Sequence, residues 1–205
     1  MAKRQTVILY LEDDPVVAAA KQVILDEAGK FFDLIALLPF GRGKNFGVAV
    51  ESLKGFGFDT VVWLTHGDED DTAPSSDVKF TTRTGKAGPL KSTSWYEMQY
   101  HFADLFTDDK RDDMAFLALC CFGDQEEFRR AMEFLLPGYA VAATEEVPAR
   151  DAAQGALAFF GEAQSMDVSQ ILQNDLAKTI SDAISRASNG HMQGYVPGDS
   201  RMRFR

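Results

Sequence analysis

Residues 60–67 have the sequence TVVWLTHG, a short run of apolar and β-branched residues that ends in a histidine and a glycine. A continuous apolar run of this length is typical of a strand that is buried on both faces of a sheet. Two other stretches share the pattern, TVILYL at residues 6–11 and MAFLALC at residues 114–120. Helical patterns separate these strands, so the sequence predicts an α/β fold with a mainly parallel sheet and helices on both faces.

The remaining segments continue this alternation. Further strands are predicted at residues 32–38 and 139–143, and helices at 16–28, 48–53, 95–106, 125–136, 151–163 and 168–187. Residues 67–94 interrupt the pattern with charged, proline, glycine and serine residues, and within them 78–85 (VKFTTRTG) suggest a small hairpin. No element is assigned to the polar, basic tail at 191–205. The chain is therefore expected to form one domain.

Composition narrows the functional classes. The chain of 205 residues has 31 acidic and 21 basic side chains and a net charge of −10, which argues against nucleic acid as a partner. No apolar run approaches the roughly 20 residues that cross a membrane, and the apolar run after the basic first residues is too short for a secretory signal. We expect a cytoplasmic protein. The two cysteines are neighbours and the three histidines are scattered, so neither a metal nor another cofactor is expected.

The candidate site follows from what stands at the strand ends, because ligands of open parallel sheets bind at the carboxyl edge. The predicted strands are followed by Glu12-Asp13-Asp14, His66-Gly67, Cys120-Cys121 and Glu145-Glu146. A histidine and a cysteine at the ends of adjacent strands form a base and a nucleophile, since a nearby imidazole activates a thiol. The backbone N–H of Gly67 beside the base suits a developing oxyanion.

The segments VVWLTHG (61–67) and MAFLALCCFG (114–123) resemble the corresponding strands of the caspase-like cysteine peptidases, which include caspases, metacaspases and CHAT domains. Residues 126–160 resemble the helix, strand and helix that follow in CHAT domains, so the resemblance covers about residues 6–165. It implies a three-layer sandwich and a cysteine endopeptidase. Residues 1–165 would form the peptidase domain, and the helix and tail at 166–205 would complete it.

The resemblance also implies individual roles. His66 would be the general base and acid, a cysteine the nucleophile, and the N–H groups of Gly67 and that cysteine the oxyanion donors. A Cys-x-x-Gly spacing, as in CHAT domains and metacaspases, selects Cys120, which we prefer, whereas the Cys-x-Gly spacing of caspases selects Cys121. Leu119 departs from the small or polar residues that are usual at its position.

Glu12, Asp13 and Asp14 stand where caspases and metacaspases place charged residues on the floor of their specificity pocket. An acidic floor suits arginine or lysine, because a buried cation requires a carboxylate partner. The sequence therefore predicts cleavage of protein or peptide substrates after Arg or Lys, with a regulatory protein as a further partner. A simpler interpretation of the acidic turn is an N-cap for the helix that starts at Pro15.

Two other functional classes compete with the peptidase. A catalytically inactive caspase-like module for protein binding would agree with Leu119 and with two cysteines buried as small apolar residues. ILYLEDDP at residues 8–15 also resembles the first strand and acid pair of receiver domains, which are phosphorylation switches. That alternative lacks the aspartate and lysine expected at two later strand ends, where Thr65-His66 and Glu145-Glu146 stand instead.

Overall fold

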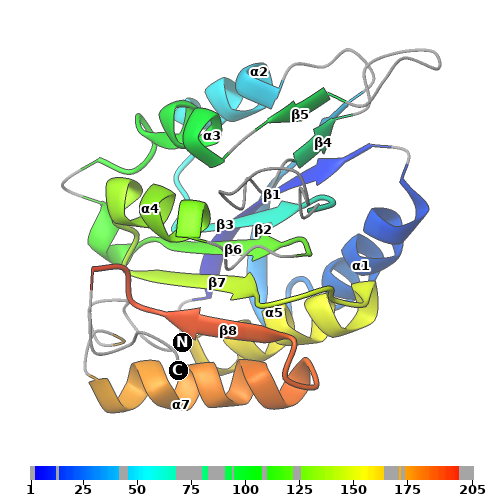
Figure 1. Ribbon diagram of the computed structural model, residues 1–205, viewed down its shortest axis with the longest axis vertical. Coiled ribbons are helices and arrows are strands. Elements are labelled where there is room, and N and C mark those ends of the chain that lie inside the picture. The colour runs from blue at the N-terminus through cyan, green and yellow to red at the C-terminus, as the bar shows by residue number, and fades with distance from the viewer. Residues whose placement is uncertain are drawn as a thin grey trace.

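The computed structural model describes residues 3–12, 14–41, 46–67, 80–82, 91–93, 95–107, 110–121, 126–163, 171 and 174–198. Its centre is a six-stranded sheet with the order β2-β1-β3-β6-β7-β8 (Figure 1). Five strands are parallel: β1 (Arg4–Leu11), β2 (Phe32–Phe40), β3 (Thr60–Leu64), β6 (Ala115–Leu119) and β7 (Tyr139–Ala143). The edge strand β8 (Met192–Tyr195) runs antiparallel to β7.

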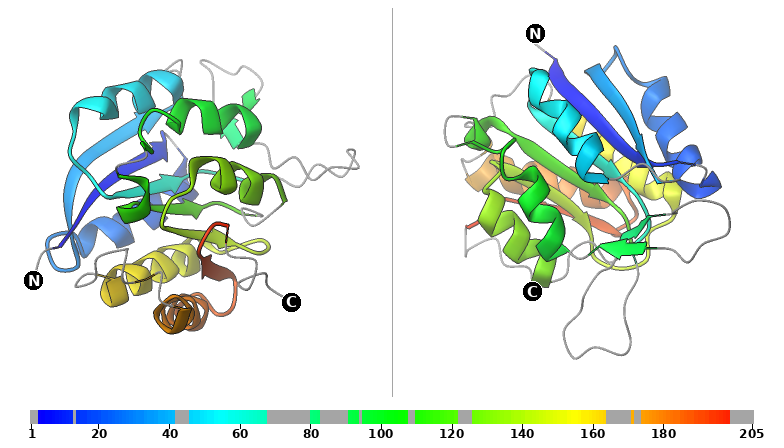
Figure 2. Two further views of the ribbon diagram at one scale, coloured as in Figure 1. Left: turned by 90° about the vertical axis from the view of Figure 1, so that its left-hand side faces the viewer. Right: turned by 90° about the horizontal axis from the view of Figure 1, so that it is seen from above.

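Helices cover both faces of this sheet, which makes the molecule a three-layer sandwich (Figure 2). One layer contains α1 (Pro15–Asp26), α5 (Ala149–Ala163) and α7 (Asn174–Ala187). The opposite layer contains α2 (Phe46–Glu51), α3 (Trp95–Phe102) and α4 (Glu126–Leu135). Two short 3-10 helices, η1 (Ser52–Gly55) and η2 (Arg111–Asp113), lie before β3 and β6. Every residue of β3, β6 and β7 is buried, as expected for strands covered on both sides.

Aromatic packing holds α3 against the sheet. The ring of Trp63 in β3 lies 5.1 Å from that of Phe40 in β2 and 5.8 Å from that of Phe102 in α3, measured between ring centroids. Phe116 in β6 lies 5.2 Å from Phe102 on the other side. Because such rings bury large apolar areas at defined angles, this cluster fixes where α3 crosses the strands.

The predicted fold class is confirmed: the chain is α/β, the sheet is mainly parallel and helices cover both faces. One strand was missed, since β8 lies in the tail to which no element was assigned. The suggested hairpin is confirmed only in its first strand: β4 (Phe80–Thr82) pairs antiparallel with β5 (Lys91–Thr93), and residues 83–90 lie outside the described ranges. None of the helices within those ranges is both long and apolar enough to cross a membrane.

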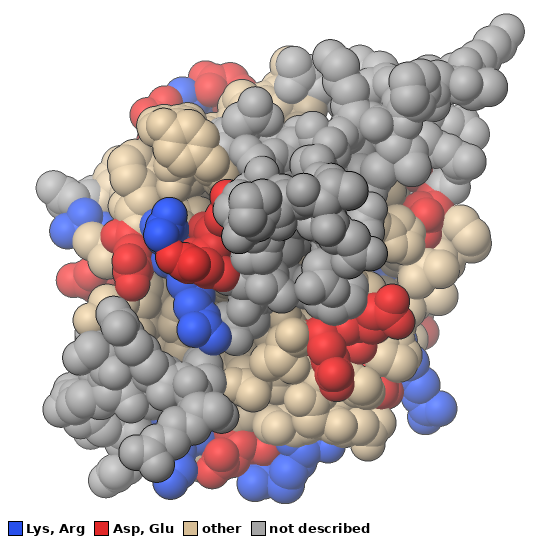
Figure 3. Space-filling model, in the orientation of Figure 1, with Lys and Arg blue, Asp and Glu red and all other residues tan. Residues whose placement is uncertain are grey.

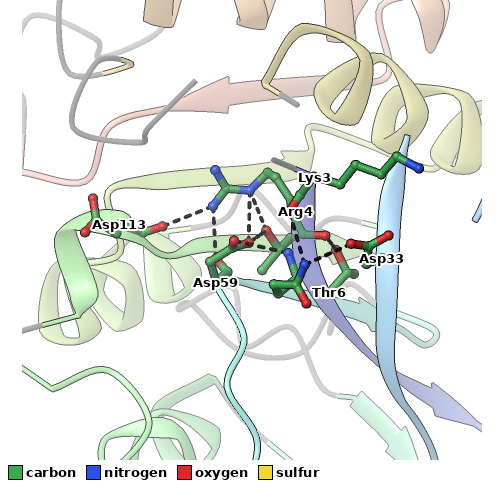
Figure 4. A network of polar contacts seen from close by, with 8 residues as sticks. Lys3, Arg4, Thr6, Asp33, Asp59 and Asp113 are labelled. Atoms are coloured by element: carbon green, nitrogen blue, oxygen red, sulfur yellow. Dashed lines mark hydrogen bonds and ion pairs between the residues drawn. The ribbon is translucent and has the colours of Figure 1, made fainter. Parts of the chain in front are cut away.

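A buried arginine ties the strands together at the edge where the parallel strands begin (Figure 4). Arg4 is 5% exposed, and its Nε donates to Thr60 Oγ1 at 2.6 Å and lies 3.2 Å from Asp59 Oδ1. Its Nη2 donates to the carbonyl oxygens of Asp59 and Asp113 at 3.1 and 3.0 Å. One guanidinium therefore joins the start of β1 to the segments that precede β3 and β6.

The docking of β8 depends on Gly194, which has no side chain. The Tyr139 hydroxyl donates to the Ala177 carbonyl in α7 at 3.0 Å and passes beside Gly194 of β8. A Cβ at position 194 would lie 2.3 Å from that hydroxyl oxygen. Tyr139 is fully buried and cannot move aside freely.

Gly194→Ala is therefore expected to lower the free energy of unfolding by about 2 kcal/mol, the usual cost of overpacking a buried site. Chemical denaturation would measure the change. Gly57→Ala is the matched control, because a Cβ at position 57 would have no atom within 4 Å. Equal stability of the two variants would contradict the prediction.

Candidate active site

His66 and Cys121 leave the sheet at the carboxyl ends of two neighbouring strands. β3 and β6 are paired in parallel up to Leu64 and Leu119, and the Thr65 N–H continues the pairing to the Leu119 carbonyl at 3.4 Å. His66 is the second residue beyond β3, and Cys121 is the second residue beyond β6. The expected meeting of the histidine and cysteine segments at one sheet edge is therefore present.

Gly67 lies directly against the backbone of Cys121. A Cβ built at position 67 would lie 1.8 Å from the Cys121 carbonyl oxygen and 2.8 Å from its carbonyl carbon. Any other residue would collide with main-chain atoms, which cannot rotate away as a side chain can. The glycine thus allows the segment after β3 to touch the segment after β6.

The two cysteines have different environments. Cys120 is 2% exposed and belongs to the core, and burial, with a smaller contribution from Cys121, raises the pKa of its thiol. Cys121 is partly exposed, and its Sγ lies 3.9 Å from the carbonyl oxygen of Val147. The thiolate is the reactive form of a cysteine and must be accessible to a substrate. These environments therefore favour Cys121 as the nucleophile, whereas the sequence favoured Cys120.

Asp14 holds the imidazole of His66. Its Oδ2 lies 2.8 Å from His66 Nε2, while Oδ1 accepts the backbone N–H groups of Val16 and Val17 at 2.9 and 3.0 Å. Burial alone would raise the pKa of Asp14, but the hydrogen bonds from Val17 and His66, together with the imidazole charge, lower it below its ordinary value. The carboxylate is therefore ionised at neutral pH.

Of the acidic residues predicted for a specificity pocket, Glu12 and Asp14 make different contacts. Asp14 is the N-cap of α1, one of the two roles predicted for this turn, and it also pairs with His66. The backbone N–H of Glu12 donates to the Phe40 carbonyl at 2.8 Å, and the Glu12 side chain is partly exposed. Asp13 lies outside the described residues.

The sequence predicted Glu145 and Glu146 at this edge, but two contacts that are made there were missed. The connection from β7 to α5 borders the site, because the Val147 carbonyl approaches the thiol of Cys121. The exposed Glu145 and Glu146 stand in this connection. On the face of the molecule drawn in Figure 3, acidic side chains gather in several places. The pairing of Asp14 with His66 was the second omission. Its only signal was Asp-Pro after the first strand, which predicts that the aspartate caps a helix beginning at the edge where His66 emerges.

Within the described ranges, no three His, Cys, Asp or Glu side chains gather as ligands of a metal ion would. The groups available for chemistry are the thiol of Cys121, the imidazole of His66 and the carboxylate of Asp14, together with backbone N–H groups.

Gly67→Ala is expected to abolish any activity of this site, since its methyl group would overlap the Cys121 carbonyl and push the two segments apart. Thiol-directed labelling and peptide hydrolysis would measure the loss, with thermal unfolding recorded in parallel. Gly55→Ala is the control, because a Cβ there meets nothing within 4 Å. Full activity of Gly67→Ala would show that the close approach is unimportant.

Comparisons with known proteins support the fold. No protein-family model and no curated protein matches the sequence. Among solved structures, the chain is similar to the X-ray structure of a secreted C11 cysteine protease from Bacteroides thetaiotaomicron, called iotapain. The TM-score is 0.50 at 14% sequence identity, and the alignment covers 96% of this chain and 67% of the protease chain.

At this identity the similarity concerns the fold alone. It confirms that the mainly parallel six-stranded sheet with helices on both faces is a caspase-like fold. The fold of receiver domains has the strand order 2-1-3-4-5, which β2-β1-β3-β6-β7 also follow, but here the antiparallel β8 extends the sheet beyond β7.

Proposed function

We propose that this chain is a cysteine peptidase in which Cys121 is the nucleophile and His66 the general base and acid. The contact of Gly67 with the Cys121 backbone carries the proposal, because it joins the histidine segment to the one accessible cysteine of the described chain. The similarity in fold to a cysteine protease agrees with it. The finer likeness to CHAT domains and metacaspases, and the cytoplasmic location, stay predictions.

In the proposed reaction, Cys121 and His66 act in both steps, the formation of a thioester and its hydrolysis. His66 takes the thiol proton of Cys121, and the sulfur attacks the carbonyl carbon of the peptide bond. The N–H groups of Gly67 and Cys121 donate to the oxygen that becomes negatively charged. His66 then gives its proton to the departing amine, which leaves a thioester. Water, deprotonated by His66, cleaves the thioester, and the proton returns to the sulfur as the carboxylic acid leaves.

For the substrate we propose cleavage after arginine or lysine. The net charge of −10 favours basic peptides in general. Glu12 follows β1 and Glu146 follows β7, so acidic residues flank the dyad segments on both sides along the sheet edge. Because a carboxylate forms charge-assisted hydrogen bonds with a cationic side chain, basic side chains of a substrate gain more beside these residues than neutral ones.

The test is labelling with a peptidyl electrophile that carries arginine, followed by mass spectrometric mapping of the modified cysteine. We expect modification of Cys121, and we expect His66→Ala to prevent it. Modification of Cys120 would overturn the assignment, and absence of any modification would favour the inactive interaction module.

The substrate preference is tested separately with a peptide library that varies the residue before the cut. We expect the fastest hydrolysis after arginine or lysine. Hydrolysis after aspartate or apolar residues would contradict the proposed specificity while leaving the dyad intact.

A further inference from the structure

We propose that Asp14 is the positioning residue of His66: its carboxylate keeps Nε2 of the imidazole protonated and leaves Nδ1 as the nitrogen that serves the Cys121 thiol. This inference rests on the proposed peptidase function, since it assigns the partner of the general base. It extends the dyad to three residues that come from the ends of β1, β3 and β6.

The geometry of Asp14 is that of a fixed group. Its Oδ2 is 2.8 Å from Nε2 of His66, within hydrogen-bond distance. The other oxygen accepts two backbone N–H groups at the start of α1, which prevents the carboxylate from rotating away from the ring. The side chain is 22% exposed and that of His66 is 37% exposed, so water competes only in part.

The charge of Asp14 determines the tautomer. An ionised carboxylate only accepts hydrogen bonds, so the ring nitrogen that faces it must carry a proton. In the neutral imidazole the proton is then on Nε2, and Nδ1 keeps a lone pair that can take the proton of a thiol. When His66 becomes positively charged during the reaction, the carboxylate 2.8 Å away stabilises that charge.

A purely structural role makes a different prediction. As the N-cap of α1, Asp14 needs only one oxygen and no histidine, and serine or asparagine would cap the helix as well. Two substitutions therefore separate the roles. Asp14→Ser preserves a cap but is too short to reach the ring. Asp14→Asn preserves the cap and presents an amide N–H₂ to Nε2, which favours the tautomer with the proton on Nδ1.

The experiment measures peptide hydrolysis, thermal unfolding and the ¹⁵N spectrum of the imidazole at alkaline pH. We expect both variants to unfold close to the wild-type temperature. kcat should fall by about 10³-fold in Asp14→Asn with KM nearly unchanged, as for a group that acts through the base. The spectrum should show His66 protonated at Nε2 in the wild type and at Nδ1 in Asp14→Asn.

Asp26→Asn is the matched control, because it removes the same charge from an exposed side chain at the other end of α1. It should change neither kcat nor the tautomer. Wild-type kcat and an unchanged tautomer in Asp14→Asn would overturn the inference and leave Asp14 as a helix cap, while loss of activity in Cys121→Ala would still support the peptidase. A wild-type protein that hydrolyses no peptide, yet shows the expected tautomers, would overturn the peptidase and support the role of Asp14.

Discussion

Replacing Cys121 with alanine is expected to abolish peptide hydrolysis, with kcat/KM at least about 10⁴-fold below wild type, because the nucleophile and the base act as one unit. The fold should be unaffected, since the Cys121 side chain is partly exposed and its thiol interacts only weakly with the Val147 carbonyl, at 3.9 Å. Steady-state kinetics on an arginyl peptide would measure the loss, and circular dichroism would establish that the variant is folded.

Cys120→Ala is the matched control, one residue away. The thiol of Cys120 is buried in the core and its pKa is raised by burial, so it holds little thiolate at neutral pH. We expect this variant to lose some stability through a small cavity and to keep its activity. An inactive Cys120→Ala with an active Cys121→Ala would restore the preference for the longer Cys-x-x-Gly spacing.

Arg4→Ala is expected to lower the free energy of unfolding by about 3 kcal/mol, although residue 4 lies at the opposite end of the strands from the candidate site. The substitution removes the contacts described above from a guanidinium that is 5% exposed, and leaves Asp59 and two carbonyl groups without that partner. Asp59 is 34% exposed, and its access to water keeps the cost near the lower end of the range for a buried charge. Denaturant titration would measure the change.

Arg130→Ala is the control for this substitution. Arg130 also pairs with a carboxylate, that of Glu126, but both side chains are about 70% exposed. Exposed pairs of this kind contribute at most about 1 kcal/mol, since water solvates both charges. If the two variants were equally stable, the Arg4 network would have no special structural role.

The central strands could be predicted because burial on both faces leaves a direct mark in the sequence. TVVWL in β3, AFLAL in β6 and YAVAA in β7 contain no polar side chain after the first residue. β8 has no comparable mark. Its sequence MQGY contains a glycine and a glutamine, and it is a strand because β7 offers an open edge beside it.

The candidate site could be predicted only in part for a similar reason. The meeting of His66 with a cysteine follows from strand order, which the alternation of strands and helices already indicates. The choice between Cys120 and Cys121 depends on which residue is the first to leave the core after β6, and a one-residue shift exchanges buried and exposed positions. The pairing of Asp14 with His66 depends on how α1 begins, a property of three-dimensional geometry that spacing does not express.

The antiparallel position of β8 has a consequence for synthesis on the ribosome. The five parallel strands and all the described helices emerge before residues 192–195. Until β8 follows, one row of backbone N–H and C=O groups of β7 is therefore unpaired. An open strand edge of apolar sequence is a template for pairing with other chains. During translation this edge is therefore exposed to aggregation and to chaperones, and the docking of Met192–Tyr195 ends that exposure.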